Sequence, residues 1–422
     1  MAHRRAHAPD PSVRVALEPA PRPLARSDRS FPPPPSHRSG PGQRSGGATT
    51  RSPRRPDLDA RRVNGLAGLA VLVLVATGVG LPLPGGHLAV DALLVVIGFR
   101  LGLGMVRMST ARRNWLQRFW LTALGPIVAP TLLAVALVTT YTWWLGQLDE
   151  AEVRAVVGTV AMVPNLFQIF AGVGFPAIDH LWLVGLIVQF TLLLPLAVGA
   201  MRRHGAPTVG LSLVALAVAV AVLRSGFVLT GQAAPHSIAI STLTRTDGLL
   251  LGAAVAFTPR SVLYRVPASF TTPAIGVLAV VLALGPNPIA RPGLALGLLV
   301  PIAVVATAAA VVAGLTGGQG GLLAPVLDSI GLRWLGERAL GIYIWHELLG
   351  VALDAGTLGA GPGDGWPGAS IFVVRLVFAL AAGAASYRYL QLPVRAVADR
   401  LTSGSRRAGP IATTAGPSLR TT

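Results

Sequence analysis

The sequence predicts an all-α integral membrane protein of about ten transmembrane helices with one re-entrant or interfacial segment. Three observations support this fold class. Of the 422 residues, 52% are hydrophobic and only 12% are charged. Apolar runs long enough to cross a hydrocarbon layer of about 30 Å recur along the chain from Gly65 onward. Arginines gather between these runs, as the positive-inside rule requires of cytoplasmic loops. We therefore expect lipid to surround most of the chain.

Charge and composition narrow the function classes. The net charge of +18 lies mostly in the tails and short loops, which favours anionic lipid headgroups over nucleic acid as the partner. The chain contains no cysteine, so a disulfide framework, a thiolate metal site and a cysteine nucleophile are excluded. No phosphate-binding loop and no metal-spaced cluster of histidines or carboxylates occurs in the sequence. We expect neither a bound metal nor a bound cofactor.

The chain divides into three parts. Residues 1–62 are rich in Arg, Pro, Ser and Gly without apolar periodicity, and are predicted to form a disordered cytoplasmic tail. Residues 63–395 form the expected multi-pass domain, and residues 396–422 a second cytoplasmic tail. Arg61 and Arg62 directly precede the first apolar run and fit a positive-inside anchor. Both termini are therefore predicted on the cytoplasmic side of the plasma membrane.

Ten spans follow from the apolar runs and from the arginines between them. They cover about Gly65 to Leu83, His87 to Val106, Phe119 to Trp143, Leu181 to Met201, Pro207 to Leu223, Asp247 to Phe257, Pro273 to Leu284, Leu294 to Leu315, Ala339 to Ala355 and Ser370 to Tyr389. A further apolar run, Ala155 to Val173, would place Arg202 and Arg203 outside if it crossed. Because Pro164 and Asn165 interrupt this run, we interpret it as re-entrant or interfacial.

The span from Ala339 to Ala355 contains a histidine and a carboxylate side by side, His346 and Glu347. Ionisable groups are costly at membrane depth and usually face a bundle interior or a wet cavity. This pair is therefore the strongest pointer to a functional pocket. Adjacent residues of a helix diverge by about 100°, so we expect Glu347 to meet another helix and not to contact His346. The plain alternative is a neutral histidine hydrogen-bonded within the bundle, beside a protonated or paired glutamate.

Six short segments follow one another along the chain in a recognisable order. They are GLAGLAVL from Gly65, GHLAVDALLVVIGF from Gly86, HLW from His180 with QF from Gln189 and LLLP from Leu192, TRTDGLLLG from Thr244, LG from Leu335 with IYIWH from Ile342, and SYRY from Ser386 with Pro393. Each alone is weakly specific because apolar helices match one another easily. The ordered set resembles the integral-membrane acyltransferase 3 family, whose members O-acylate envelope sugars and related acceptors.

The resemblance implies transfer of an acyl group from cytoplasmic acyl-coenzyme A to a hydroxyl of an envelope carbohydrate or lipid-linked acceptor. The family's opening motif carries an arginine and an essential histidine where this chain has Ala67 and Gly78. The family's Glu-Glu pair is replaced by Ile187 and Val188, and its closing glutamate by Gln391. Acyl transfer needs a base for the hydroxyl proton and a donor for the carbonyl oxygen, which glycine and alanine cannot supply. An intact mechanism must therefore use other residues.

The polar residues retained from the motifs supply the candidates. His346 and Asp91 are the candidate catalytic residues, with His346 as a relocated base whose ring Asp91 or Glu347 would orient. The candidate substrate-binding residues are Glu347, His180, Trp182, Arg245 and Asp247.

These candidates also have plainer interpretations. Arg245 and Asp247 lie two apart at the outer start of a span and fit a surface ion pair or interfacial anchor. Trp182 fits the aromatic belt of a membrane protein, and His87 fits a solvated loop histidine. Two further functions stay open: a non-catalytic relative that binds an acyl donor, a lipid or a partner enzyme, and a small-solute transporter that uses the intramembrane carboxylate and histidine as a proton path.

Overall fold

A computed structural model describes the chain over residues 55–81, 83–109, 114–172, 174–286, 290–316, 324–354 and 368–403. Over these residues the fold is all-helical and contains no strand, so the all-α part of the predicted fold class is confirmed. Most of the two predicted tails, residues 1–54 and 404–422, lies outside the described residues. The first helix begins at Arg55, within the segment predicted as the N-terminal tail.

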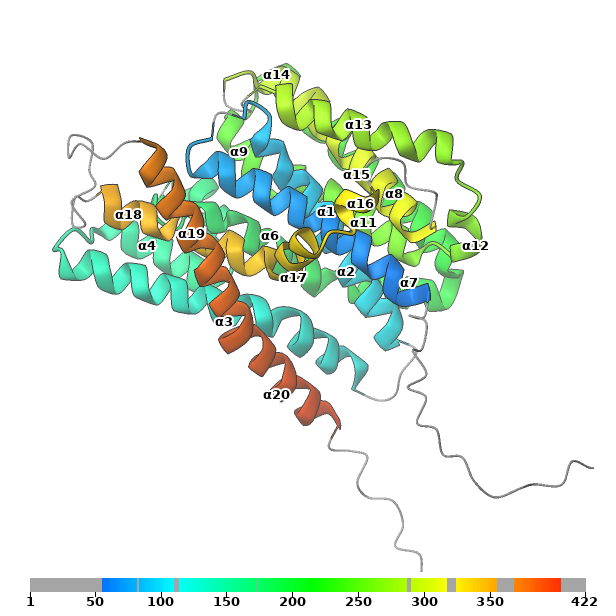
Figure 1. Ribbon diagram of the computed structural model, residues 1–422, viewed down its shortest axis with the longest axis horizontal. Coiled ribbons are helices and arrows are strands. Elements are labelled where there is room, and N and C mark those ends of the chain that lie inside the picture. Colours follow the sequence, from blue (N-terminus) through cyan, green and yellow to red (C-terminus); the bar gives the residue numbers. More distant parts are fainter. Residues whose placement is uncertain are drawn as a thin grey trace, which may run out of the picture. The chain divides into compact units, whose positions relative to one another are not determined.

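Figure 1 shows the succession of helices over the described residues. The α-helices are α1 (Arg55–Gly78), α2 (Ala89–Ser109), α3 (Trp115–Trp144), α4 (Glu150–Val160), α5 (Pro164–Leu166), α6 (Trp182–Leu193), α7 (Pro195–His204), α8 (Ala206–Thr230), α9 (Pro235–Ile240), α10 (Thr242–Arg245), α11 (Asp247–Phe257), α12 (Arg260–Leu263), α13 (Ala268–Leu284), α14 (Pro292–Leu294), α15 (Val300–Thr316), α16 (Ala324–Leu327), α17 (Ile330–Trp345), α18 (Leu348–Asp354), α19 (Gly368–Ser386) and α20 (Leu392–Ser403). Five short 3₁₀ or π segments adjoin them: η1 (Gly86–Leu88), η2 (Phe167–Ala171), η3 (Asp179–Leu181), η4 (Ala295–Leu299) and η5 (Tyr387–Gln391).

Seven helical stretches in the described part of the chain are long and apolar enough to cross a membrane. They are Arg61–Gly78, Gly86–Ser109, Trp115–Trp144, Asp179–His204, Ala206–Thr230, Pro292–Thr316 and Ser370–Leu401. The chain is thus a multi-pass membrane protein, and these stretches match seven of the ten predicted spans. Two further predicted spans, Asp247–Phe257 and Pro273–Leu284, are apolar but shorter helices. Whether these two helices cross the membrane stays a prediction, and so does the count of ten spans.

The remaining predicted span, Ala339 to Ala355, is not one helix. α17 ends at Trp345, a turn follows at His346 and Glu347, and α18 begins at Leu348. The His346 ring reaches back to the carbonyl of Tyr343, which would accept from the backbone N–H of Glu347 in a continuous helix. The predicted span is therefore not a continuous helix, and whether it crosses the membrane stays a prediction. A break at membrane depth is tolerated where the backbone lines a cavity.

The segment predicted to be re-entrant or interfacial forms α4, α5 and η2. α4 has 11 residues, about 16 Å of helix, and is too short to cross the hydrocarbon layer alone. Asn165, at the predicted interruption, donates to the Thr242 hydroxyl at 2.8 Å and accepts from the Gln189 amide at 3.0 Å. These bonds fix α5 against α6 and α10. Whether the segment enters the membrane stays a prediction.

Glycines set the closest helix contacts. α1 packs on α17, and α2 packs on α11. A Cβ atom at Gly336 would lie 1.8 Å from a backbone oxygen of α1, and one at Gly68 would lie 1.9 Å from a backbone oxygen of α17. Between α2 and α11, a Cβ atom at Gly98 would lie 2.2 Å from a backbone oxygen of α11, and one at Gly252 would lie 2.0 Å from a backbone oxygen of α2. Small residues let membrane helices approach until their backbones touch, which stabilises the pair by close packing.

We expect Gly336→Ala to lower the free energy of unfolding by about 2 kcal/mol or more, because the added methyl group forces α17 away from α1. Gly331→Ala on the same helix is the matched control, since a Cβ there meets no atom within 4 Å. It should be neutral or stabilising by up to about 1 kcal/mol through helix propensity. Thermal unfolding in detergent measures both, and equal midpoints for the two variants would contradict the packing described here.

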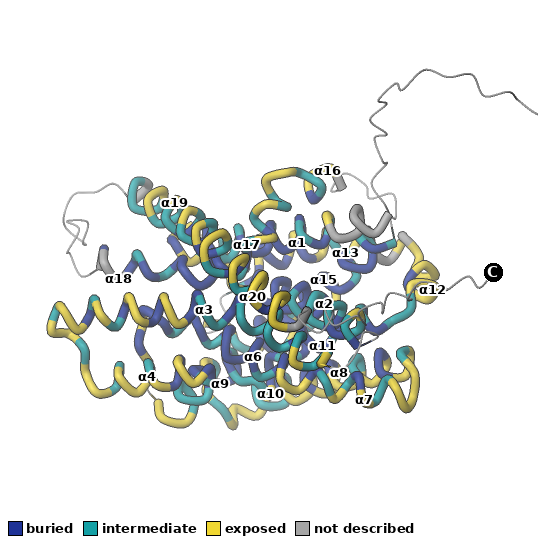
Figure 2. Tube along the Cα trace, turned by 90° about the horizontal axis from the view of Figure 1, so that it is seen from below, coloured by how far each residue is buried: buried dark blue, intermediate teal, exposed yellow. Residues whose placement is uncertain are grey.

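Burial separates the inner helices from those that face lipid (Figure 2). In the stretch Gly86–Ser109, which contains α2, 72% of the residues in the most apolar window are buried. The corresponding fraction is only 22% for α8 and 17% for the stretch that joins α19 and α20. Large apolar side chains such as Leu229 on α8 are exposed, as expected where lipid is the solvent. α2 is therefore a central helix, and α8 and α19 are peripheral.

The orientation predicted from the arginines can be tested in this cysteine-free chain. Single cysteines at Gln147 and Pro288 are expected to react with a membrane-impermeant maleimide from outside the cell, whereas cysteines at Thr110, His204 and Ser329 should react only after permeabilisation. Thr110 and Pro288 lie outside the described residues. Labelling of position 204 from outside would show that the segment preceding α6 crosses the membrane.

Candidate functional site

One cavity of about 290 Å³ brings together most of the predicted site residues. Its wall comes from the end of α1, the η1–α2 and η3–α6 junctions, α9, α10, η4 and the break after α17. Four of the eight histidines in the sequence line it: His87, His180, His236 and His346. His87 and His236 are exposed, while His346 is buried. The predicted solvated histidine, His87, therefore also belongs to the cavity, at its exposed side.

His346 is anchored through one ring nitrogen and meets Glu347 through the other. Its Nδ1 lies 2.6 Å from the carbonyl oxygen of Tyr343, and only an N–H can donate there, so Nδ1 carries the proton. Its Nε2 lies 3.3 Å from Oε1 of Glu347. The His346 side chain is 4% exposed and that of Glu347 is 36% exposed. The prediction that Glu347 does not contact His346 is wrong, because the helix ends before these residues and the 100° rotation no longer applies.

His180 and Tyr343 support the ring of His346. The Tyr343 hydroxyl donates to the backbone carbonyl of His180, and Nε2 of His180 donates to the carbonyl of Ile344 at 3.1 Å. The rings of His180 and His346 meet edge to face, with centroids 5.0 Å apart. Nδ1 of His180 is then an acceptor, and it is buried with no hydrogen-bond partner. His180 and Trp182 thus line the cavity, beyond the interfacial belt role that sequence also allowed.

Gly78 lies directly against this pair. A Cβ atom at Gly78 would be 3.1 Å from Cδ2 of His346 and 3.2 Å from Oε1 of Glu347. The position at which the resemblance expects a histidine is therefore beside His346, and the His346 ring occupies space that a larger side chain at 78 would need. Ala67, the other departure, is fully buried in α1.

Arg245 supplies the cation of the cavity. Its Nη2 lies 2.9 Å from Oδ1 of Asp91, and both side chains are at most 4% exposed. Its guanidinium stacks over Trp182 at 5.9 Å from the ring centroid. The Nε and Nη1 atoms of Arg245 are buried without a hydrogen-bond partner. Asp91, a predicted catalytic candidate, does not line the cavity and contacts it only through Arg245.

Asp247 pairs with Arg224, a residue that the sequence analysis did not select. Nη2 of Arg224 lies 2.9 Å from Oδ2 of Asp247, and both side chains are at most 2% exposed. Arg224 also donates to the carbonyls of Leu296 at 2.9 Å and Thr244 at 2.7 Å. The interpretation of Arg245 and Asp247 as a surface ion pair is thus wrong: each is buried and pairs with a residue on another helix.

The cavity offers proton-transfer and hydrogen-bonding groups but no metal site. Among the residues that the structure describes, no group of three or more histidines and carboxylates is arranged to hold a metal ion. The wall instead contains His346, whose Nδ1 donates to a backbone carbonyl, and the adjoining carboxylate of Glu347. It also contains Arg245 with two unpartnered donors and His180 with one unpartnered acceptor. This set suits removal of a proton from a hydroxyl and stabilisation of negative charge on oxygen.

Comparisons of the chain with models of protein families, with curated protein sequences and with solved structures find no match. The resemblance to membrane acyltransferases therefore rests on the six motifs, and the cavity has to be interpreted from its own chemistry.

Proposed function

We propose that this protein is a plasma-membrane O-acyltransferase that moves an acyl group from acyl-coenzyme A to a hydroxyl of an envelope carbohydrate or lipid-linked acceptor. The observation that carries the proposal is the geometry of His346. Its Nδ1–H is held by the Tyr343 carbonyl, which leaves Nε2 beside Glu347 in the cavity. In this chain His346 takes the role that the family's motif gives to a histidine at the position of Gly78.

The reaction follows from these contacts. Nε2 of His346 takes the proton of the acceptor hydroxyl as its oxygen attacks the carbonyl carbon of the thioester. The negative charge that develops on the carbonyl oxygen is stabilised by the unpartnered Nε–H and Nη1–H of Arg245. Glu347 stabilises the imidazolium. The carbon–sulfur bond then breaks, the thiolate of coenzyme A takes the proton from His346, and the ester product leaves.

A hydroxyl-rich acceptor suits the cavity wall. A sugar both donates and accepts hydrogen bonds, and the wall offers donors on Arg245 and an acceptor on His180 that no protein group satisfies. The cavity lies at the Gly78 end of α1, about 24 Å along the helix from Arg62. With the arginine-rich end inside, as the positive-inside rule predicts, the exposed His87 and His236 face the envelope, where such acceptors occur. The proposal therefore requires the thioester of cytoplasmic acyl-coenzyme A to reach the cavity from the opposite side, between the helices.

Reconstitution tests the proposal. The purified full chain in proteoliposomes would receive acyl-coenzyme A with a radiolabelled acyl group, together with an extract of envelope carbohydrate and lipid-linked sugar. We expect label to appear in the acceptor as an ester that mild alkali or hydroxylamine cleaves, with release of free coenzyme A. Binding of the donor without any transfer would instead identify a non-catalytic relative.

Glu347→Gln is expected to lower acyl transfer by about 10- to 100-fold, because the amide keeps the shape of the carboxylate but cannot stabilise the imidazolium of His346. Expression and membrane insertion should stay near those of the unmodified protein. The matched control is Glu337→Gln on α17, which removes a carboxylate that contacts Arg338 and is 46% exposed. If Glu347→Leu instead raised stability in detergent and left acyl transfer intact, Glu347 would be a tolerated residue with no part in the reaction.

A further inference from the structure

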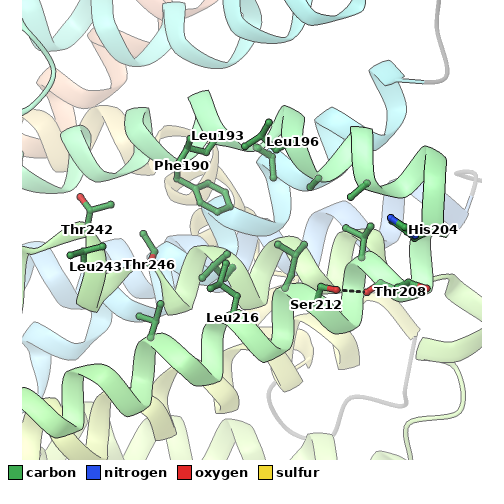
Figure 3. A pocket seen from close by; sticks show the side chains of 17 residues that line it. Phe190, Leu193, Leu196, His204, Thr208, Ser212, Leu216, Thr242, Leu243 and Thr246 are labelled. Atoms are coloured by element: carbon green, nitrogen blue, oxygen red, sulfur yellow. Dashed lines mark hydrogen bonds between the residues drawn. The ribbon is translucent and has the colours of Figure 1, made fainter.

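A second hollow, separate from the polar cavity, lies between α6–α7 and α8 (Figure 3). It has a volume of about 560 Å³ and is lined almost entirely by apolar side chains. Phe190, Leu193 and Leu196 form one wall, and Leu216 lies on the opposite wall, on α8. Leu196 is 71% exposed, so the groove opens toward the surroundings of the bundle, where lipid is the solvent.

The two ends of the groove differ in charge. Thr242 lies at one end and His204 at the other (Figure 3). His204 closes α7, whose last turn also contains Arg202 and Arg203. Arg202 donates to the carbonyl of Ser109 at 3.2 Å and is thereby fixed toward α2. His204 lines the end of the groove, and both it and the preceding Arg203 are exposed. An amphiphile with an anionic head matches this arrangement.

The length of the groove also fits one acyl chain. Its wall on α8 runs from Thr208 to Val220, which is about 18 Å of helix. One leaflet contributes about half of a 30 Å hydrocarbon layer, or about 15 Å. A phospholipid chain that begins at the basic end of α7 would therefore reach about as far as Thr242.

The opposite face of α8 provides a comparison within the molecule. A second apolar groove there, between α8, α11 and α15, has a volume of about 570 Å³. Its lining contains no basic side chain, and its one charged residue is Asp247, whose carboxylate pairs with Arg224. The two grooves are alike in size and in apolar character, and of these two only the one beside α7 ends at a basic residue, His204, which Arg203 precedes in the chain.

We propose that the groove between α6–α7 and α8 binds one anionic phospholipid of the cytoplasmic leaflet. Its phosphate lies at Arg203 and His204, and one of its acyl chains lies along α8. Anionic lipids populate the cytoplasmic leaflet, where the arginine rule also places this end of α7. The site is independent of acyl transfer, since α10 separates it from the polar cavity: Thr242 and Leu243 face the groove, whereas Arg245 lines the cavity.

Native mass spectrometry of the delipidated full chain tests the site, with palmitoyl-oleoyl phosphatidylglycerol as the probe and phosphatidylcholine of the same chains for comparison. We expect one phosphatidylglycerol to bind saturably and tighter than phosphatidylcholine. Ala197→Trp, which fills the groove, should abolish this complex. Ala221→Trp in the groove on the opposite face should leave it intact. Arg203→Gln, a surface substitution, should weaken binding about fivefold for phosphatidylglycerol only.

Three results would overturn the proposal. Equal affinity for the two lipids would show that the headgroup is not recognised. Equal loss of binding in Ala197→Trp and Ala221→Trp would show that the lipid does not occupy this groove. Displacement of phosphatidylglycerol by palmitoyl-coenzyme A at lower concentration would assign the groove to an acyl donor instead. Arg203→Gln keeps the proposal testable if Ala197→Trp fails to fold.

Discussion

His346→Ala is expected to lower the turnover rate of acyl transfer by about 10²- to 10⁴-fold, the range in which a positioned general base contributes. The substitution removes Nε2, which lies 3.3 Å from Glu347, and leaves α17 unchanged because the helix ends at Trp345. His346→Gln should be nearly as slow, since an amide cannot take a proton at neutral pH. The reconstituted assay measures both variants at equal folded protein.

The kinetic pattern separates a base from a binding residue. Loss of the base lowers kcat, whereas loss of ground-state binding raises KM with kcat unchanged. His236→Ala is the matched control, because His236 lines the same cavity but is exposed, whereas His346 is buried. It should retain most of the turnover rate. Turnover by His346→Ala at the unmodified rate would remove His346 from the mechanism.

Arg224→Met is expected to lower the free energy of unfolding by about 3–5 kcal/mol, the cost of breaking a buried ion pair from one side. The substitution leaves Asp247 buried without its cation, and it removes donors from the carbonyls of Leu296 and Thr244. The double variant Arg224→Met with Asp247→Leu should recover much of the loss, because no unpaired charge stays buried. Denaturant unfolding in mixed micelles measures all three proteins.

The exposed ion pair of α4 is the control for this effect. Arg154 contacts Glu150 one turn away, with side chains 57% and 81% exposed. Arg154→Met should change the free energy of unfolding by less than about 1 kcal/mol, because solvent screens a surface pair. If Arg224→Met and Arg154→Met were equally mild, Arg224 would not be the buried partner of Asp247.

Hydropathy predicted the parts of the fold that depend only on lipid as the solvent. The seven long helices agree with predicted spans because about 20 apolar residues in a row have few other stable structures. Where polar groups interrupt an apolar run, hydropathy alone was insufficient, as the break at His346 and the continuation of α8 past Arg224 show.

Arg224 illustrates what the sequence signal could have shown. The predicted span ended at Leu223, before Arg224, yet the apolar residues 227–229 follow and the helix ends at Thr230. A single arginine with apolar residues on both sides is costly in lipid and therefore indicates a buried carboxylate partner. The identity of that partner, Asp247, depends on how α8 packs against α11, and spacing in the sequence does not encode this.

The site itself was only partly predictable. His346, Glu347, His180, Trp182 and Arg245 all line one cavity. Their mutual contacts were not predictable, because the end of α17 places two consecutive side chains together and long-range packing joins Arg245 to α2.

Gly78 became informative only in three dimensions. In the sequence, Gly78 stands where the family motif has a histidine. In the structure, His346 and Glu347 lie against Gly78, in the space that a side chain at this position would need. The departure from the family pattern and the retained histidine are thus neighbours. This proximity adds a second reason, beside the hydrogen bond from Nδ1 to the Tyr343 carbonyl, for the proposal that His346 is the base.

Incorporation of a radiolabelled acyl group into envelope fractions tests the central claim most directly. Cells that lack this protein would be compared with cells that produce equal amounts of the unmodified chain or of His346→Ala. We expect alkali-labile label in envelope carbohydrate or lipid-linked sugar with the unmodified protein, and background label in the other two strains. Equal label in all three strains, or undiminished label with His346→Ala, would contradict it.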